Sequence, residues 1–443
     1  MPTFTITDLG SKGEGVGKHE GLILFVEKAL PGDVIEAEIT KLTPRYGFAK
    51  LKRIETPSPD RIEAPCPLVS TCGSCQIQSL AYSAQLRWKE QKVRSAFARI
   101  AHLPDASIEP ILGMETPFYY RNKAQFPACW VNKKLALGFY KVGSHDIVDV
   151  PTCAVQHPAM NLVLSRLRDY FALHPVSVYS EKEHKGLLRH VVMRVSILTG
   201  KVLLCLVING RKFPSIDFLV SWVKASNVLE GVVINIHTQR NNVIMGHECQ
   251  LVWGKDHLID TIGTLQFRIS PLSFFQVNPT QTKVLYDQVL EAAALTGKET
   301  VLDMFSGIGT IALYLASHAL KVVGLEEVSQ AVEDATFNAA LNKCQNVEFL
   351  CGDAEIRLKQ YTDEGKKADV VVLDPPRKGC EKALLHDIVA LAPSRIIYVS
   401  CDPATLARDS VELIAGGYQL KTCKLVDLFP HTIHVESVAL FIK

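Results

Sequence analysis

From about Ser270 to the C-terminus, short apolar runs alternate with longer segments of helical periodicity. The runs have the length of buried strands, and the segments between them have the length of crossover helices. This alternation predicts a doubly wound α/β sheet that binds its ligands at the carboxyl ends of parallel strands. Strands are expected at Thr300–Asp303, Lys321–Glu326, Val347–Leu350, Asp369–Leu373 and Arg395–Ser400, and helices at Ser329–Asn342, Glu381–Ala390 and Pro403–Ala415.

Acidic residues stand at the ends of four of these strands. In VLDMFSGIGT, Asp303 precedes Gly307 and Gly309, and a helix begins near Thr310. Glycines let a ligand approach the backbone, and a carboxylate at the end of the next strand can bind both ribose hydroxyls. Alone, Asp353 or Asp374 could instead cap a helix. Together the four resemble the S-adenosylmethionine fold of class I methyltransferases: Asp303, Glu326, Asp353 and Asp374.

The motif LDPPRKG follows the fourth expected strand. Two prolines give the chain a stiff exit and hold Asp374 towards the ligand crevice. Amino-group methyltransferases commonly have an aromatic residue after the prolines, whereas this chain has Arg377. Methylation of an amine is therefore disfavoured.

A candidate nucleophile and a candidate base occur in the last two motifs. Cys401, in VSCDPATLARD, ends an expected buried strand just before Pro403 opens a helix. A helix N-terminus lowers the pKa of a thiol and activates it, so we expect Cys401 to be the nucleophile, with Cys380 a weaker candidate. In LFPHTIHVES, Glu436 precedes the last strand and could remove a proton in the same crevice.

The net charge of +2 conceals a basic first part and an acidic second part. Residues 1–267 hold 31 basic and 24 acidic side chains, against 17 and 22 in residues 268–443. Residues 1–55 contain short strands separated by Gly and Pro turns at GSKGEGVGK (10–18) and LPGD (30–33), which predict a small barrel. Lys41–Arg53 carries five basic residues and no acid, with Tyr46 and Phe48 between them. That pattern suits an RNA-facing strand pair, or equally an edge strand guarded by lysine.

The 12 cysteines are more consistent with metal ligands, catalytic thiols and core residues than with disulfides. No apolar run reaches the roughly 18 residues of a membrane span, and no signal peptide is visible, so a cytoplasmic protein is expected. The segment CPLVSTCGSC spaces Cys66, Cys72 and Cys75 as C-x5-C-x2-C. With a fourth thiolate such a set suits either zinc or an iron–sulfur cluster.

Together with FFQVN at 274–278, these motifs resemble the RNA (uracil-5-)-methyltransferase family, specifically its 23S rRNA branch. The resemblance implies a TRAM-like RNA-binding barrel at 1–58, a mixed α+β iron–sulfur and RNA-binding domain at 59–267, and a catalytic domain at 268–443. It also implies a [4Fe–4S] cluster, because Cys153 matches the fourth ligand beside Cys66, Cys72 and Cys75. The methyl donor S-adenosylmethionine would contact Gln276, Phe305, Thr310, Glu326, Asp353 and Asp374.

Thr310 departs from the asparagine that is often found at this position in that branch. The tRNA branch lacks the barrel and the cluster, which argues for rRNA. The expected reaction is methylation of uridine C5 in 23S rRNA, with Cys401 adding to C6 and Glu436 removing the C5 proton. A monomer is expected, and whether one or two uridines are modified stays open. The alternatives are a tRNA uracil-5 or RNA cytosine-5 methyltransferase and a non-catalytic RNA-binding assembly factor.

Overall fold

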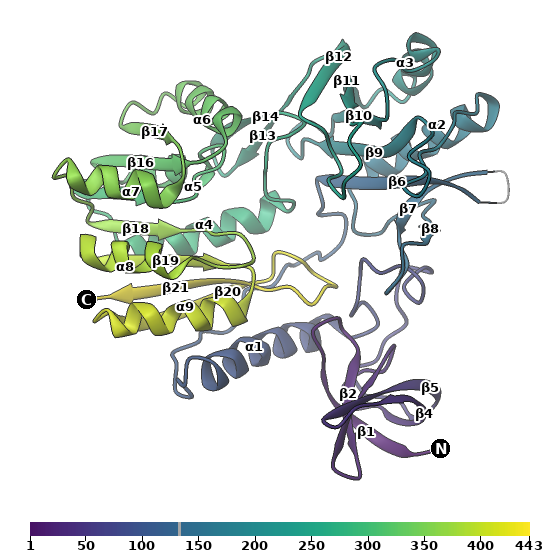
Figure 1. Ribbon diagram of the computed structural model, residues 1–443, viewed down its shortest axis with the longest axis horizontal. Coiled ribbons are helices and arrows are strands. Elements are labelled where there is room, and N and C mark those ends of the chain that lie inside the picture. The colour runs from purple at the N-terminus through teal and green to yellow at the C-terminus, as the bar shows by residue number, and fades with distance from the viewer. Residues whose placement is uncertain (132–133) are drawn as a thin grey trace.

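The computed structural model describes residues 1–131 and 134–443, which form three parts in chain order (Figure 1). The first part is a closed five-stranded barrel in the order β1-β2-β3-β5-β4, which confirms the expected fold. Its core is apolar, with Leu24, Val26 and Ile35 completely buried. The strands are β1 (Thr3–Leu9), β2 (Gly15–His19), β3 (Leu22–Val26), β4 (Val34–Leu42) and β5 (Tyr46–Thr56).

Strand β2 lies in a segment that the sequence predicted to be a turn. Its two glycines are needed for close contacts within the barrel rather than for a turn. A Cβ atom on Gly15 would come within 2.7 Å of the carbonyl oxygen of Ala29, and one on Gly17 within 2.7 Å of the carbonyl oxygen of Thr5. Only glycine can pair at these two positions without displacing the neighbouring backbone.

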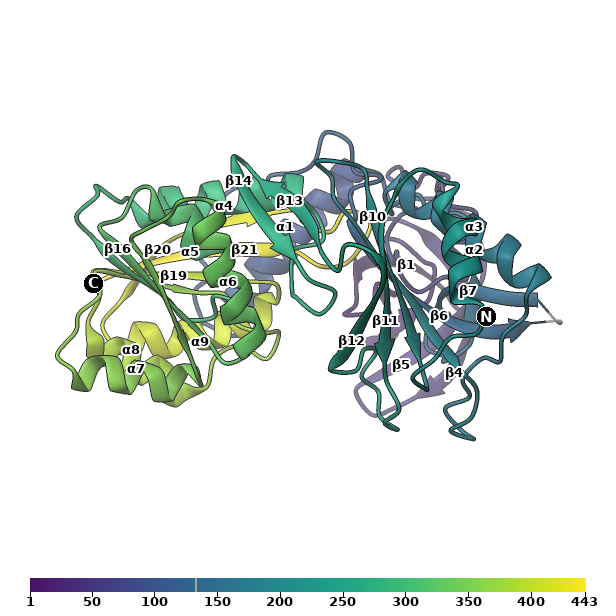
Figure 2. The ribbon, with the colours of Figure 1, turned by 90° about the horizontal axis from the view of Figure 1, so that it is seen from above.

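The second part is a seven-stranded sheet in the order β12-β11-β10-β9-β6-β7-β8. The helices α2 (Pro158–Leu173) and α3 (Ile216–Lys224) cover one of its faces, and the other face is turned towards the third part of the chain (Figure 2). The strands are β6 (Lys123–Val131), β7 (Lys134–Tyr140), β8 (Ile147–Asp149), β9 (Leu188–Val195), β10 (Val202–Ile208), β11 (Leu229–Ile236) and β12 (Glu248–Gly254).

The third part is a seven-stranded sheet in the order β17-β16-β15-β18-β19-β21-β20. Its first five strands in that order are parallel, and β21 runs antiparallel to both of its neighbours, β19 and β20. The predicted doubly wound sheet is therefore confirmed. A hairpin of β13 (Leu258–Ile262) and β14 (Leu265–Ile269) precedes it. The strands are β15 (Thr300–Asp303), β16 (Lys321–Glu326), β17 (Val347–Cys351), β18 (Val370–Leu373), β19 (Arg395–Ser400), β20 (Gln419–Val426) and β21 (Glu436–Ile442).

Helices join and flank these strands on both sides of the sheet (Figures 1 and 2). Helix α4 enters the domain, and the others follow single strands in the order expected of crossover connections. Within the described part of the chain, no helix is long and apolar enough to cross a membrane. The helices are α4 (Pro279–Ala293), α5 (Thr310–Ala316), α6 (Ser329–Leu341), α7 (Ala354–Asp363), α8 (Lys382–Leu391) and α9 (Pro403–Ala415).

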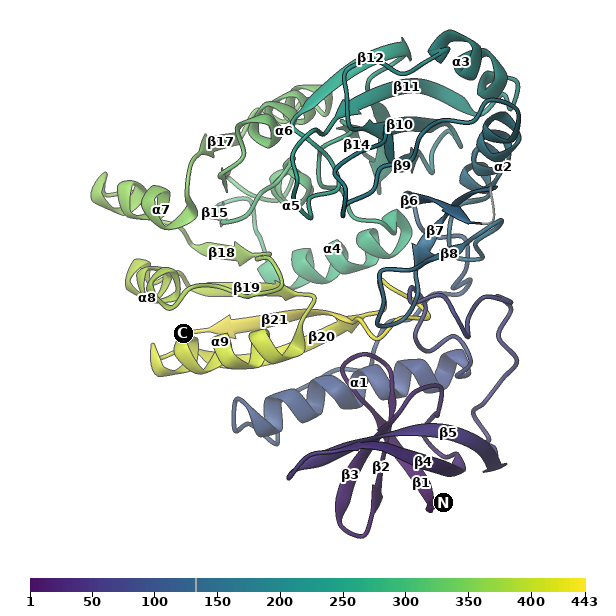
Figure 3. The ribbon, with the colours of Figure 1, turned by 45° about the vertical axis from the view of Figure 1, so that its right-hand side comes forward.

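Helix α1 (Tyr82–Arg99) precedes the central sheet in sequence but packs against the third part of the chain. Its Val93 and Phe97 are fully buried in the same apolar core as Leu406 and Ala407 of α9. The helix therefore lies between the barrel and the C-terminal sheet (Figure 3). The domain limits at 58 and 267 stay predictions, with α1 a structural link between the parts that they separate.

Candidate active site

The four predicted acids lie where the parallel strands β15 to β18 end. Glu326, the last residue of β16, is held by two backbone amides: Gly307 and Val328 each donate to a different carboxylate oxygen at 2.9 Å. Asp353 caps helix α7, because its Oδ1 accepts hydrogen bonds from the amides of Glu355 and Ile356 at 3.0 and 3.1 Å. The cap uses only one of its two oxygens.

Asp303, which is fully buried, and Asp374, which is partly buried, form the acidic centre of this edge. Both oxygens of Asp303 are buried and have no hydrogen-bond partner among the described residues. Burial, followed by the Asp374 carboxylate, raises the pKa of Asp303 to about 7. Burial also raises the pKa of Asp374 to about 7. Unpaired buried carboxylates are costly in a free protein, and a cationic ligand such as a sulfonium would stabilise them.

The other three residues predicted to contact the donor lie in three different segments of the chain. Gln276 is buried in the segment between β14 and α4. Phe305 is partly buried and packs on the apolar core, close to Asp303 in sequence. The Thr310 hydroxyl lies 2.8 Å from the hydroxyl of Tyr286, a buried residue of α4 that the sequence did not single out. The hydroxyl of Thr310, at the start of α5, is thus already hydrogen-bonded to α4.

Cys401 and Glu436 lie opposite each other on neighbouring strand ends. Strands β19 and β21 are antiparallel, and their last registered pair is Ser400 with Ser437. One residue beyond that pair, the same register places Cys401 opposite Glu436. Their side chains lie on the opposite face of the sheet from those of the two serines. The sequence predicted both residues, and the antiparallel return of β21 brings them together.

The expected low pKa of the Cys401 thiol is wrong for the free protein. Burial, then the nearby Glu436 carboxylate, raises its pKa to about 11, against the opposing effect of Arg377. The helix N-terminus has less effect than expected because Asp402 already caps α9, accepting a hydrogen bond from the amide of Ala404 at 2.9 Å. The other candidate thiol, Cys380, lies beside Tyr398 and Asp409, and burial raises its pKa to about 12.

Arg377 is the cation of this group of residues. Its guanidinium lowers the pKa of both Cys401 and Glu436, although burial keeps the pKa of Glu436 well above its ordinary value. Its Nη2 lies 3.2 Å from Nε2 of His434. Burial, then Arg377, lowers the pKa of His434 to about 4, so this imidazole is neutral near pH 7. In the sequence, Arg377 served only as an argument against amine methylation.

The family model for tRNA (uracil-5-)-methyltransferases matches residues 81–443, which is most of the chain. The chain belongs to this family. A TRAM-domain model matches residues 3–52. Uncharacterized RNA methyltransferases of Halalkalibacterium halodurans and Clostridium tetani are each 45% identical to it, over 98% of this chain and 95% of theirs. The predicted family, with its TRAM barrel, is thus confirmed.

A solved structure of the same fold comes from Pyrococcus abyssi. It is a tRNA (uracil-54, C5)-methyltransferase in complex with S-adenosyl-L-homocysteine, with a TM-score of 0.79 and 25% identity to this chain. The comparison covers 100% of both chains. The S-adenosylmethionine-dependent methyltransferase fold expected from the sequence is therefore confirmed.

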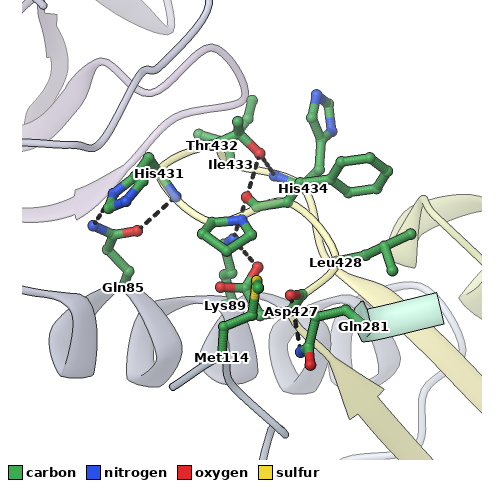
Figure 4. Close-up of polar contacts among 12 residues, drawn as sticks. Gln85, Lys89, Met114, Gln281, Asp427, Leu428, His431, Thr432, Ile433 and His434 are labelled. Atoms are coloured by element: carbon green, nitrogen blue, oxygen red, sulfur yellow. Dashed lines mark hydrogen bonds and ion pairs between the residues drawn. The ribbon is translucent and has the colours of Figure 1, made fainter. Parts of the chain in front are cut away.

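In this member of the family, helix α1 holds the loop that leads to Glu436 (Figure 4). The Nζ of Lys89 lies 2.6 Å from Oδ1 of Asp427, with both side chains fully buried, and also donates to the carbonyl of Phe429 at 3.0 Å. The Nζ of Lys92 donates to the carbonyl of Ile433 at 2.8 Å. These contacts fix the segment 427–434, which we call the 427–434 loop.

Breaking the Lys89–Asp427 pair is expected to destabilise the protein. In Lys89→Met the buried carboxylate of Asp427 loses its cation, which should lower the free energy of unfolding by about 3–5 kcal/mol. Urea denaturation followed by tryptophan fluorescence measures the change. The double variant Lys89→Met/Asp427→Leu should lose less, because it leaves no unpaired buried charge. Equal stability of Lys89→Met and the unaltered protein would contradict this role of the pair.

The four predicted cysteine ligands line one cavity of about 20 Å³, together with apolar residues such as Leu68 and Val155. Burial, and then the thiols of Cys153, Cys72 and Cys66, raise the pKa of Cys75. Within residues 1–131 and 134–443, no group of three or more His, Cys, Asp or Glu side chains is placed so that it could hold a metal ion. Four thiols around one cavity nevertheless supply the number and kind of ligands that an iron–sulfur cluster requires.

Proposed function

We propose that this protein methylates C5 of a uridine in 23S rRNA with S-adenosylmethionine as the methyl donor. The observation that carries the proposal is the placement of Cys401 opposite Glu436, beside the acidic edge that ends β15 and β18. Uracil C5 is a poor nucleophile, and addition of a thiolate to C6 turns the base into an enolate that is nucleophilic at C5. The site offers one thiol for the addition and one carboxylate for the proton removal that must follow.

The proposed reaction has three covalent steps. The Cys401 thiolate forms a bond to C6, and the electron pair of the C5–C6 double bond moves into the enolate. C5 then takes the methyl group, and the electron pair of the S–CH3 bond stays on the donor sulfur. Glu436 removes the C5 proton, the double bond re-forms, and Cys401 leaves as thiolate. The target base must be out of any stack to reach these side chains.

The raised pKa of Cys401 has a consequence for the order of binding. Asp374 contributes to that raised pKa, and Arg377 opposes it. A cationic donor bound beside Asp374 would offset the carboxylate charge and lower the pKa of the thiol. The nucleophile is therefore protonated in the free protein and becomes more easily ionised once the donor is bound.

The barrel supplies an RNA-binding surface in this proposal. Phe25, Tyr46 and Phe48 form a cluster of rings with centroids 5.6–5.8 Å apart, and the last two side chains are about 40% exposed. The basic residues of Lys41–Arg53 surround them in sequence. Exposed rings among cations are the combination that binds unpaired bases and phosphates of single-stranded RNA. Since its substrate is RNA, we place the protein in the cytoplasm, and we expect a monomer.

A tRNA uridine is the second candidate substrate. The Pyrococcus abyssi enzyme acts on tRNA, and its chain is covered completely by this one, barrel included. The presence of the barrel therefore no longer argues against tRNA. Initial rates of labelled methyl transfer to unmodified 23S rRNA and to unmodified tRNA, measured separately and in competition, distinguish the two. The proposal expects rRNA to be preferred, and a preference for tRNA would overturn it in favour of the second candidate.

A [4Fe–4S] cluster held by Cys66, Cys72, Cys75 and Cys153 is part of the proposal. When bound it would order the segment around these cysteines, and no step of the reaction transfers an electron. That segment touches the 427–434 loop, because the amide of Ile77 donates to the carbonyl of His431 at 3.2 Å. The hydroxyl of Tyr120, which packs with Cys153 and Cys75, donates to the carbonyl of Pro430 at 3.0 Å.

Removing one of the four thiols is expected to remove the cluster. Anaerobically purified protein should contain iron and acid-labile sulfide and absorb visible light, and Cys153→Ser should lose all three signals, because all four thiolates are required. The matched control is Cys129→Ser, a cysteine outside this cavity, which should keep them. Zinc without sulfide in the unaltered protein would contradict the assignment.

A further inference from the structure

Two cations lie side by side on the face of the central sheet that α2 and α3 leave uncovered. Lys123 of β6 is registered directly opposite Arg194 of β9. Their strand neighbours Ala124 and Met193 point the other way, into the apolar core beneath the helices. The face that carries the two cations is turned towards the C-terminal sheet (Figure 2).

The pair adjoins the donor side of the active site. Arg194 donates through Nη2 to the carbonyl of Ser273, three residues before Gln276. Asn122, next to Lys123, donates through Nδ2 to the carbonyl of Gln276 at 3.1 Å and through its amide to the carbonyl of Val277 at 2.9 Å. The cations therefore lie on the seam between the central sheet and the segment that carries Gln276.

No carboxylate within the described residues forms an ion pair with Lys123 or Arg194, and none is among the groups that shift their pKa values. Arg194 is 4% exposed and its Nε has no hydrogen-bond partner there, while the partly buried Lys123 takes part in no ion pair or side-chain hydrogen bond. Like charges that face each other across paired strands repel, and buried cations without an anionic partner are costly. Burial, then Arg194 and Arg121, lower the pKa of Lys123 to about 7. An anion would relieve both the repulsion and the loss of hydration.

We infer that Lys123 and Arg194 form an anion-binding site for a phosphodiester of the substrate RNA. The inference rests on the proposed function and extends it to a named contact on the central sheet. The guanidinium of Arg194 and the ammonium of Lys123 lie on the same face of the sheet, where both could donate hydrogen bonds to one phosphodiester. A phosphodiester carries one negative charge and two unesterified oxygens that can accept them. The position beside the Gln276 segment puts the bound phosphate on the RNA strand close to the target uridine.

Proton uptake on RNA binding follows from this site. Phosphate favours the charged form of Lys123 and raises its pKa from about 7. At pH 8 the free side chain is mostly neutral, so RNA binding takes up a proton, whereas at pH 6 it is already charged. The groups that face it are Arg121, Arg194 and the thiol of Cys205, none of which is a carboxylate. Asp260 of β13 lies just past the end of β9 that carries Arg194, where its Oδ1 accepts hydrogen bonds from the hydroxyl of Ser196 at 3.4 Å and from the amide of Leu198 at 3.1 Å. It is not among the groups that shift the pKa of Lys123 or Arg194.

The test compares Lys123→Met with the control variant Lys224→Met. The control also removes one positive charge, but from helix α3, which covers the opposite face of the sheet. Binding of unmodified 23S rRNA, and of tRNA, is measured over a range of salt concentrations. Lys123→Met should bind RNA about tenfold more weakly, with the slope of log affinity against log salt reduced by about one. Its affinity for S-adenosylhomocysteine should be unchanged, and proton uptake at pH 8 should be lost.

The thermal stability of Lys123→Met should be equal to or above that of the unaltered protein, because an uncompensated cation is removed, so misfolding would not explain weaker binding. Unchanged affinity and salt slope, or the same loss in Lys224→Met, would overturn the phosphate site. Such a result, in a protein that still methylates RNA, would leave the proposed function standing. Absence of methylation with the phosphate effect intact would overturn the proposed function alone.

Discussion

Replacing Cys401 with alanine is expected to abolish methyl transfer, with a loss on the order of 10⁴-fold or more, as when other covalent nucleophiles are removed. Without the thiol nothing can add to C6, so C5 never becomes nucleophilic. No other cysteine among the described residues stands opposite Glu436 in the register of β19 and β21. The measurement is transfer of labelled methyl groups to unmodified 23S rRNA.

Two controls separate loss of chemistry from loss of structure. Cys401→Ala should bind S-adenosylhomocysteine nearly as well as the unaltered protein, because the acidic edge stays intact. Cys380→Ala removes a buried thiol that lies beside Tyr398 and Asp409, so it should keep its turnover. RNA that contains 5-fluorouridine should trap a covalent adduct on Cys401, because a base can remove a proton from C5 but cannot remove fluorine. Normal turnover by Cys401→Ala would contradict the assignment.

Changing Glu436 to glutamine is expected to stop the reaction after methyl transfer. The amide has nearly the shape of the carboxyl group but cannot accept the C5 proton, so elimination of the cysteine is blocked. A methylated RNA–protein adduct should therefore accumulate, at about one methyl group per protein, and persist in a denaturing gel. The matched control is Glu412→Gln on α9, a partly exposed carboxylate that pairs with Lys382, and this variant should turn over normally. If Glu436→Gln forms no adduct, another group removes the proton.

The sequence predicted the C-terminal sheet and its acids correctly because both depend on local patterns. Short buried strands and intervening helices are visible as periodicity, and each acid stands at a strand end. The opposition of Cys401 and Glu436 depends instead on the antiparallel return of β21 between β19 and β20. The resemblance to the family supplied both residues, and the register supplies the physical reason for their pairing.

Other features depend on contacts between segments far apart in the chain, which no local pattern shows. In the sequence, Lys89 is only one of several basic residues between Tyr82 and Ile100, yet it pairs with Asp427, 338 residues away. Strand β2 was missed because glycines usually mark turns, whereas here they allow close backbone contact. The raised pKa of Cys401 arises from burial and from Glu436, which outweigh the helix end that the sequence suggested.

The central claim is the formation of 5-methyluridine in 23S rRNA by this protein. The most direct measurement incubates the protein with S-adenosylmethionine and unmodified 23S rRNA, digests the RNA, and maps the methylated nucleotide by mass spectrometry. The account predicts 5-methyluridine at one or two defined positions in 23S rRNA, and none with Cys401→Ala. A methyl group on cytidine, or 5-methyluridine formed only in tRNA, would contradict it.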